Sequence, residues 1–140
     1  MPNPALLKAL GYGTFVFALK HSVGVHIILY RIKGHHLIVR QAAAKEFQPL
    51  RQFQELPNVA YTRSLAGWYQ GGAFLVLTAL LNLNWAKNPD SLKEPLNAAM
   101  AALVSLISWG SSAWYLRKGL KASGVLTAAA GLLQAWAAFQ

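Results

Sequence analysis

Hydrophobic residues run in four long stretches separated by shorter polar segments. The stretches cover residues 6–30, 64–85, 95–116 and 120–139. Each is close to or above the roughly 20 helical residues that cross a hydrocarbon core about 30 Å thick. The last three carry only scattered Ser, Thr, Asn and Gln, without the continuous polar stripe of a helix in a soluble bundle. The pattern predicts an all-α integral membrane four-helix bundle, a single transmembrane domain of residues 1–140, with a soluble bundle as the alternative.

Turn-forming and helix-capping residues mark the ends of these stretches. Residues 88–91, Asn-Pro-Asp-Ser, form a turn cluster ahead of the third stretch. Glu94 and Pro95 suit a helix start, because proline gives up no needed N–H in the first turn and a carboxylate meets the positive end of the helix dipole. Gly119 lies between the third and fourth stretches, where a glycine favours the C-terminal cap. A tight connection is therefore expected at each end of the third span.

Aromatic and small residues fit the same arrangement. Trp85 and Trp136 are expected near one membrane face, and Trp68 and Trp114 near the other, as in the aromatic belts of a membrane protein. Small residues recur at four-residue spacing, which lets helix backbones approach closely in lipid. The pairs are Gly67 and Gly71, Ala98 and Ala102, and Gly124 and Ala128. We expect these positions to serve helix packing.

The basic residues are distributed unequally between the two predicted sides of the membrane. The chain has 13 Lys and Arg against four Asp and Glu. Nine bases fall in the first and third connections: Arg31, Lys33, Arg40, Lys45, Arg51, Arg63, Arg117, Lys118 and Lys121. Three fall on the opposite side: Lys8, Lys87 and Lys93. The positive-inside rule then places both basic connections in the cytoplasm and both termini on the non-cytoplasmic side, in the endoplasmic reticulum if the cell is eukaryotic.

The first connection contains a segment too polar to span a membrane, residues 37–57 (LIVRQAAAKEFQPLRQFQELP). Apolar residues recur there at three- and four-residue steps, from Val39 to Phe53, while Arg40, Lys45 and Arg51 fall elsewhere. This pattern predicts an amphipathic segment that lies on the anionic cytoplasmic leaflet. A loop folded over the cytoplasmic end of the bundle is the alternative, and both descriptions can hold. With basic residues set between long apolar runs, we expect a lipid bilayer as partner and no nucleic acid.

A lysine interrupts the first apolar stretch, within FALKHSVGVHIILYRIKG (residues 17–34). If the span ends near Tyr30, Lys20 lies about ten residues, or roughly 15 Å, from its cytoplasmic end. A lysine at that depth costs on the order of 3 kcal/mol and normally faces a bundle interior or a watery cavity. None of the four acids falls within a span, so no buried carboxylate is at hand. Lys20 is therefore a candidate site residue.

Two histidines accompany Lys20. His21 points about 100° round the helix from it, and His26 shares a face with Ser22 at four-residue spacing. A reactive site would use Lys20 as an electrostatic anchor or amine and one histidine as a proton shuttle. The candidate catalytic residues are thus Lys20, His21 and His26. In the alternative, polar side chains such as the histidines, Gln70 and Ser108 only hydrogen-bond between helices, and Lys20 faces a small water pocket.

Other chemistries have less support in the sequence. Without cysteine, disulfides, zinc–thiolate sites and thiol catalysis are excluded. His35 and His36, with Glu46 and Glu55, match no HExxH spacing, and no glycine-rich phosphate loop or nucleophile elbow is present. We therefore assign no metal and no cofactor.

Two families show a limited resemblance. The chain length, four spans and basic first connection resemble the glutathione-using membrane enzymes of eicosanoid metabolism. Arg51 and Glu55 stand near the place of that family's arginine and glutamate, but its asparagine is missing, so the resemblance is one of architecture and no residue is carried over. The segment TRSLAGW (residues 62–68) is similar to a short part of the four-span scaffold of sterol biosynthesis in the endoplasmic reticulum.

Three classes of function remain open. The first is an enzyme or enzyme subunit that acts on a lipophilic small molecule, a terpenoid, polyketide or lipid, in a biosynthetic reaction at an intramembrane pocket near Lys20. The second is a non-catalytic scaffold or accessory subunit that holds a partner membrane protein or a second copy of the chain through its small-residue faces. The third, a transporter or channel component, is less favoured, since the spans show neither glycine- and proline-broken helices nor an inverted repeat.

Overall fold

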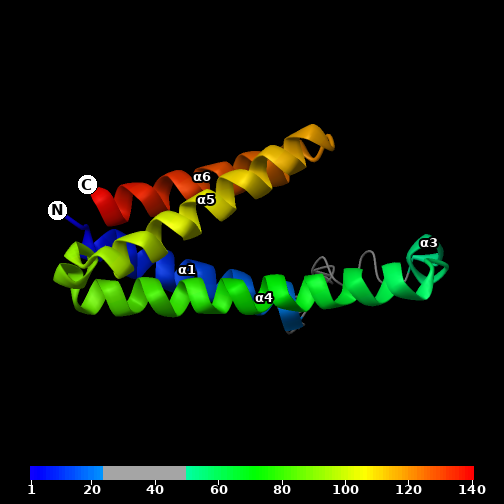
Figure 1. Ribbon diagram of the computed structural model, residues 1–140, viewed down its shortest axis with the longest axis horizontal. Coiled ribbons are helices and arrows are strands. Elements are labelled where there is room, and N and C mark those ends of the chain that lie inside the picture. Colours follow the sequence, from blue (N-terminus) through cyan, green and yellow to red (C-terminus); the bar gives the residue numbers. More distant parts are fainter. Residues whose placement is uncertain (24–49) are drawn as a thin grey trace, which may run out of the picture. The chain divides into compact units, whose positions relative to one another are not determined.

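The computed structural model describes residues 1–23 and 50–140, and all its regular structure in these ranges is helical (Figure 1). The elements are α1 (Pro4–Val23), α3 (Arg51–Gln54), α4 (Asn58–Lys87), the 3₁₀ helix η1 (Pro89–Lys93), α5 (Pro95–Arg117) and α6 (Lys121–Phe139). The all-α prediction is confirmed for this part of the chain. Most of the amphipathic segment predicted at 37–57 lies outside the described residues, which include only its end, with α3.

Three helices, α4, α5 and α6, are long and apolar enough to cross a membrane. The predicted bounds of α5 and α6 agree with the structure to within a residue. α4 begins six residues before the predicted start at Ser64. The Pro57 carbonyl oxygen accepts the first hydrogen bond of this helix, from the N–H of Tyr61 at 2.9 Å, and the polar residues that follow continue the helix. The predicted first span is described only as far as Val23, so the four-helix bundle stays a prediction.

The described chain divides into two compact units. The first unit comprises Met1–Gly13 and Thr78–Gln140, and the second comprises Thr14–Leu77. α1 and α4 contribute residues to both units. The two units are described separately below.

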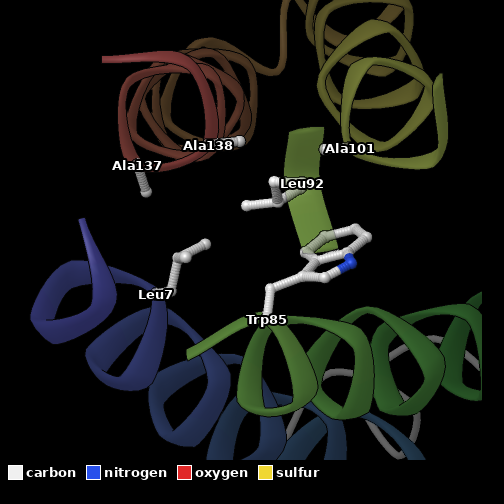
Figure 2. Packing of buried hydrophobic residues seen from close by; sticks show 6 residues of the cluster. All are labelled: Leu7, Trp85, Leu92, Ala101, Ala137 and Ala138. Carbon is white, nitrogen blue, oxygen red and sulfur yellow. The ribbon is translucent and has the colours of Figure 1, made fainter. Parts of the chain in front are cut away.

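A buried apolar cluster forms the core of the first unit (Figure 2). Its members come from α1, α4, η1, α5 and α6: Leu7, Trp85, Leu92, Ala101, Ala137 and Ala138. Trp85 is fully buried, and its indole N–H donates to Oδ1 of Asn97 at 3.2 Å, which satisfies the one polar atom that this ring brings into the core. Trp85 therefore packs inside the protein and does not face headgroups as a belt residue would, whereas Trp136 and Trp114 are exposed. The positions of these residues near the membrane faces stay predictions.

The two ends of α5 follow the local signals in the sequence. Pro95 occupies the first turn, and Glu94 is the N-cap in extended conformation. The Glu94 carboxylate does not cap the helix backbone but accepts a hydrogen bond from Nδ2 of Asn97 at 3.1 Å. At the other end Gly119 has φ +80°, the left-handed conformation that glycine adopts without strain. Both predicted boundaries are confirmed.

α5 and α6 form an antiparallel hairpin that depends on glycines at the contact (Figure 1). A Cβ added at Gly124 would lie 2.6 Å from Cγ of Leu116, and one at Gly131 would lie 2.6 Å from Nε1 of Trp109. The hydroxyl of Ser112 also donates to the Gly124 carbonyl at 2.8 Å. The predicted packing role of Gly124 is confirmed, because a Cβ at this position would overlap the Leu116 side chain of the neighbouring helix.

The two ends of the chain lie together in the first unit. The Met1 amino group donates to the Gln140 carbonyl oxygen, and the N–H of Asn3 donates to the Ala137 carbonyl at 2.9 Å. The start of α1 is thus fixed beside the end of α6.

Candidate functional site

Lys20 lies in the last turn of α1 and its side chain is exposed. The ion pairs found within the described ranges are Arg51 with Glu55 and Lys93 with Asp90, each at 2.6 Å. No described carboxylate therefore comes within ion-pair distance of the Lys20 ammonium. The Lys20 side chain is accessible to a ligand or to solvent at this part of the helix. Its catalytic role stays a prediction.

His21, the next residue, packs against α4 instead. Its imidazole stacks on the indole of Trp68, with ring centroids 3.8 Å apart and planes 16° from parallel. Phe17, one turn earlier on α1, lies 6.3 Å away by ring centroids. The Nε2 edge of the ring lies beside Gly71, where an added Cβ would stand 3.8 Å from it. The predicted turn of about 100° between neighbours explains why Lys20 is exposed while His21 is half-buried.

The third candidate, His26, lies outside the described residues, as does the Ser22–His26 hydrogen bond suggested by their spacing. The structure therefore brings Lys20 and His21 to the same turn of α1 and leaves His26 untested. The two polar residues named for interhelical hydrogen bonds differ from expectation. Ser108 donates to the Val104 carbonyl of its own helix at 2.9 Å, and Gln70 is exposed.

The first unit contains a buried polar contact that the sequence interpretation only half anticipated. Asn82 on α4 and Gln134 on α6 exchange two amide hydrogen bonds, of 2.8 and 2.9 Å, and both side chains are buried. Asn82 lies near the end of the second predicted span, where a polar residue also fits the solvated boundary, and the sequence pattern did not single out Gln134. Its position, three residues after Gly131 and four before Ala138, places it on the small-residue face of α6, and that spacing could have identified it.

This amide pair holds two helices together and offers no acid–base chemistry. Neither amide titrates, and each supplies the donor and the acceptor that the other needs. Thr78, one turn before Asn82 on α4, is also buried, and its hydroxyl has no hydrogen-bond partner among the described residues. The buried polar side chains of this region are thus all neutral. We interpret them as structural.

The surface of the described chain includes two shallow hollows that bear on the question of a ligand pocket. One, of about 230 Å³, is lined by Ala135, Trp136, Phe139 and Gln140. The other, of about 420 Å³, is lined by Gln54, Leu56, Asn58 and Tyr61. Neither hollow has Lys20 or His21 among its described lining residues. A pocket for a lipophilic molecule at Lys20 therefore stays a prediction.

The site that carries ionisable chemistry is thus the Lys20–His21 turn of α1 with Trp68 and Gly71 of α4, all in the second unit. It combines a cation, an imidazole and an aromatic support within one turn of each helix. A scan against protein-family models, a search of curated proteins and a search of solved structures each found no match to this chain.

Proposed function

We propose that this multi-pass membrane protein binds a lipophilic small molecule at the Lys20–His21 turn, as an enzyme or as the ligand-binding subunit of one. The observation that carries the proposal is the exposed Lys20 ammonium, which has no described carboxylate within reach. In the predicted span such a cation lies at bilayer depth, where it costs on the order of 3 kcal/mol unless it meets an anion or water. An anionic or carbonyl oxygen on the ligand would supply that partner.

His21 supports this proposal through its fixed ring. An imidazole changes protonation near neutral pH, so it is suited to transferring a proton to or from a ligand held by the neighbouring lysine. The Trp68 indole backs one face of the ring and fixes its plane, while Gly71 leaves Nε2 free of a covering side chain at that position. The substrate classes that fit are terpenoids, polyketides and lipids. A biosynthetic role in the endoplasmic reticulum belongs to the same proposal.

A scaffold role is the second candidate, because one glycine of α4 has room beside it. No described atom would lie within 4 Å of a Cβ added at Gly67, and the residue is exposed. A partner helix could approach the backbone there closely. A bulky residue at Gly67 would then prevent the partner helix from binding, and it would leave the described packing within this chain unchanged.

Native mass spectrometry of the protein extracted gently from its own membranes tests the proposal. Wild type is expected to carry a small lipophilic molecule, and Lys20→Met is expected to lose it, because methionine keeps the length of the side chain without the charge. Lys8→Met is the matched control, since Lys8 is an exposed lysine near the other end of the same helix. His21→Phe keeps an aromatic ring against Trp68, so it is expected to retain the ligand and to lose turnover if the imidazole transfers protons.

The outcomes separate the two candidates. A ligand that is equally abundant in wild type, Lys20→Met and Lys8→Met contradicts a site at Lys20. A protein that carries a second chain in all three forms, and loses it only in Gly67→Leu, is a scaffold. Circular dichroism of each variant establishes that the helices are retained.

A further inference from the structure

The turn between α5 and α6 concentrates positive charge on a fixed piece of backbone. The N–H of Leu120 donates to the Tyr115 carbonyl at 2.9 Å, and the N–H of Gly119 donates to the Leu116 carbonyl at 3.1 Å. With Gly119 at φ +80°, these two bonds form a Schellman motif that ends α5 and starts the return of the chain. Arg117, Lys118 and Lys121 are therefore held within five positions at one end of the hairpin (Figure 1).

No described acid neutralises this group in the first unit. All three basic side chains are exposed, and the ion pairs found in the described residues involve none of them. Asp90 and Glu94 lie before the opposite end of α5, a helix of 23 residues that is about 35 Å long. That separation exceeds the Debye length of about 8 Å at physiological ionic strength. The turn therefore presents three uncompensated positive charges.

An apolar collar lies next to these charges: Trp114 and Leu116 precede them, and Leu120 lies between Lys118 and Lys121. Trp114, Leu116 and Leu120 are 60%, 47% and 54% exposed. The Lys118 ammonium lies 5.1 Å from the centroid of the Trp114 ring, so a cation is held against an aromatic face. A surface with tryptophan and leucine next to lysine and arginine fits the boundary between acyl chains and headgroups. A nucleic acid or an acidic soluble protein would leave the apolar collar without a partner.

We propose that the α5–α6 turn surface, made of Trp114, Arg117, Lys118, Leu120 and Lys121, binds the phosphate groups of anionic phospholipids. Arg117 is suited to bidentate contact with a phosphate, and the two lysines add point charges. Trp114 and Leu120 set the depth of the turn in the leaflet. This lipid-binding surface is separate from the proposed ligand site at Lys20, which belongs to the other unit, and from the amphipathic segment predicted in the first connection.

Lipid association in reconstituted bilayers tests this surface. Purified protein is placed in phosphatidylcholine bilayers, and electron spin resonance compares the association of spin-labelled phosphatidylglycerol with that of spin-labelled phosphatidylcholine. Wild type is expected to prefer the anionic lipid. The triple variant Arg117→Gln/Lys118→Gln/Lys121→Gln is expected to lose the preference by about fivefold or more, since one basic side chain at a lipid surface contributes roughly that factor.

The matched control is Lys8→Gln/Lys87→Gln/Lys93→Gln, which removes the same net charge from exposed positions of the first unit. Its effect is expected to be small, because Lys93 is already paired with Asp90 and Glu94 lies beside them. Salt supplies a test on wild type alone: at 1 M the Debye length falls to about 3 Å, and the preference should largely disappear. Equal association of the two lipids with wild type, or an equal loss in both triple variants, would overturn the proposal.

Discussion

Replacement of Gly131 by leucine is expected to separate α5 from α6 and to lower the free energy of unfolding by about 3 kcal/mol, at the upper end of typical overpacking costs. Even the first carbon of the new side chain would stand 2.6 Å from Nε1 of Trp109 and 3.1 Å from Cβ of Ser108. The Trp109 ring is partly exposed and can turn aside, but Ser108 Cβ is attached directly to the backbone and can move only with its helix. Unfolding in mixed micelles with increasing sodium dodecyl sulfate, followed by circular dichroism, measures the change.

Gly110→Leu is the control for this substitution. Gly110 lies on α5, is exposed, and has no described atom within 4 Å of an added Cβ. Leucine is also a better helix former than glycine by about 0.8 kcal/mol, so this variant should be as stable as wild type or slightly more stable. A similar loss of stability in both variants would show that added bulk, rather than the α5–α6 contact, causes the effect.

Replacement of Asn82 by leucine is expected to lower the free energy of unfolding by about 2 kcal/mol. The cost arises because the buried Gln134 amide loses both of its hydrogen bonds to Asn82 and finds no water to replace them. Gln134→Leu should cost a similar amount for the same reason. The double variant should be more stable than the sum of the two losses predicts, because no amide is then left unpaired.

The same titration in sodium dodecyl sulfate, applied to the double-mutant cycle, measures this coupling directly. We expect about 1 kcal/mol of coupling, within the range known for hydrogen bonds in membrane proteins. Asn84→Leu is the control, since Asn84 lies two residues further on α4 and is exposed. If the two single losses simply add, the amides act separately and the pair is not a structural unit.

Local signals predicted both ends of α5 well, whereas the start of α4 was placed six residues too late. Pro95 and Gly119 fix the backbone through their own allowed conformations, so their effect on α5 does not depend on distant residues. The burial of Trp85 was not predictable in this way. A tryptophan near a span end suits either an aromatic belt or a core, and the choice is made by Leu7, Leu92 and the C-terminal end of α6, which are far away in sequence.

The geometry of the candidate site was likewise predictable only in part. Helical geometry alone indicates that Lys20 and His21 point in different directions, and the structure has one exposed and the other half-buried. The stacking of His21 on Trp68 could not be foreseen, because it depends on the register of two helices. The spacing of Gln134 from Gly131 and Ala138 indicates which face of α6 it occupies, but its partner, 52 residues away on α4, could not be identified from the sequence.

The measurement that tests the account most directly is the sidedness of the two ends of α5. The chain has no cysteine, so a single introduced cysteine is the only thiol of the protein that a maleimide can label. Asn88→Cys and Ala122→Cys change exposed residues on the two sides of α5: Asn88 precedes η1, and Ala122 is in the first turn of α6. In sealed membranes an impermeant maleimide is expected to label Asn88→Cys from the non-cytoplasmic side only and Ala122→Cys from the cytoplasmic side only. Labelling of both positions from the same side would contradict a membrane-spanning α5, and exchanged sides would contradict the predicted orientation.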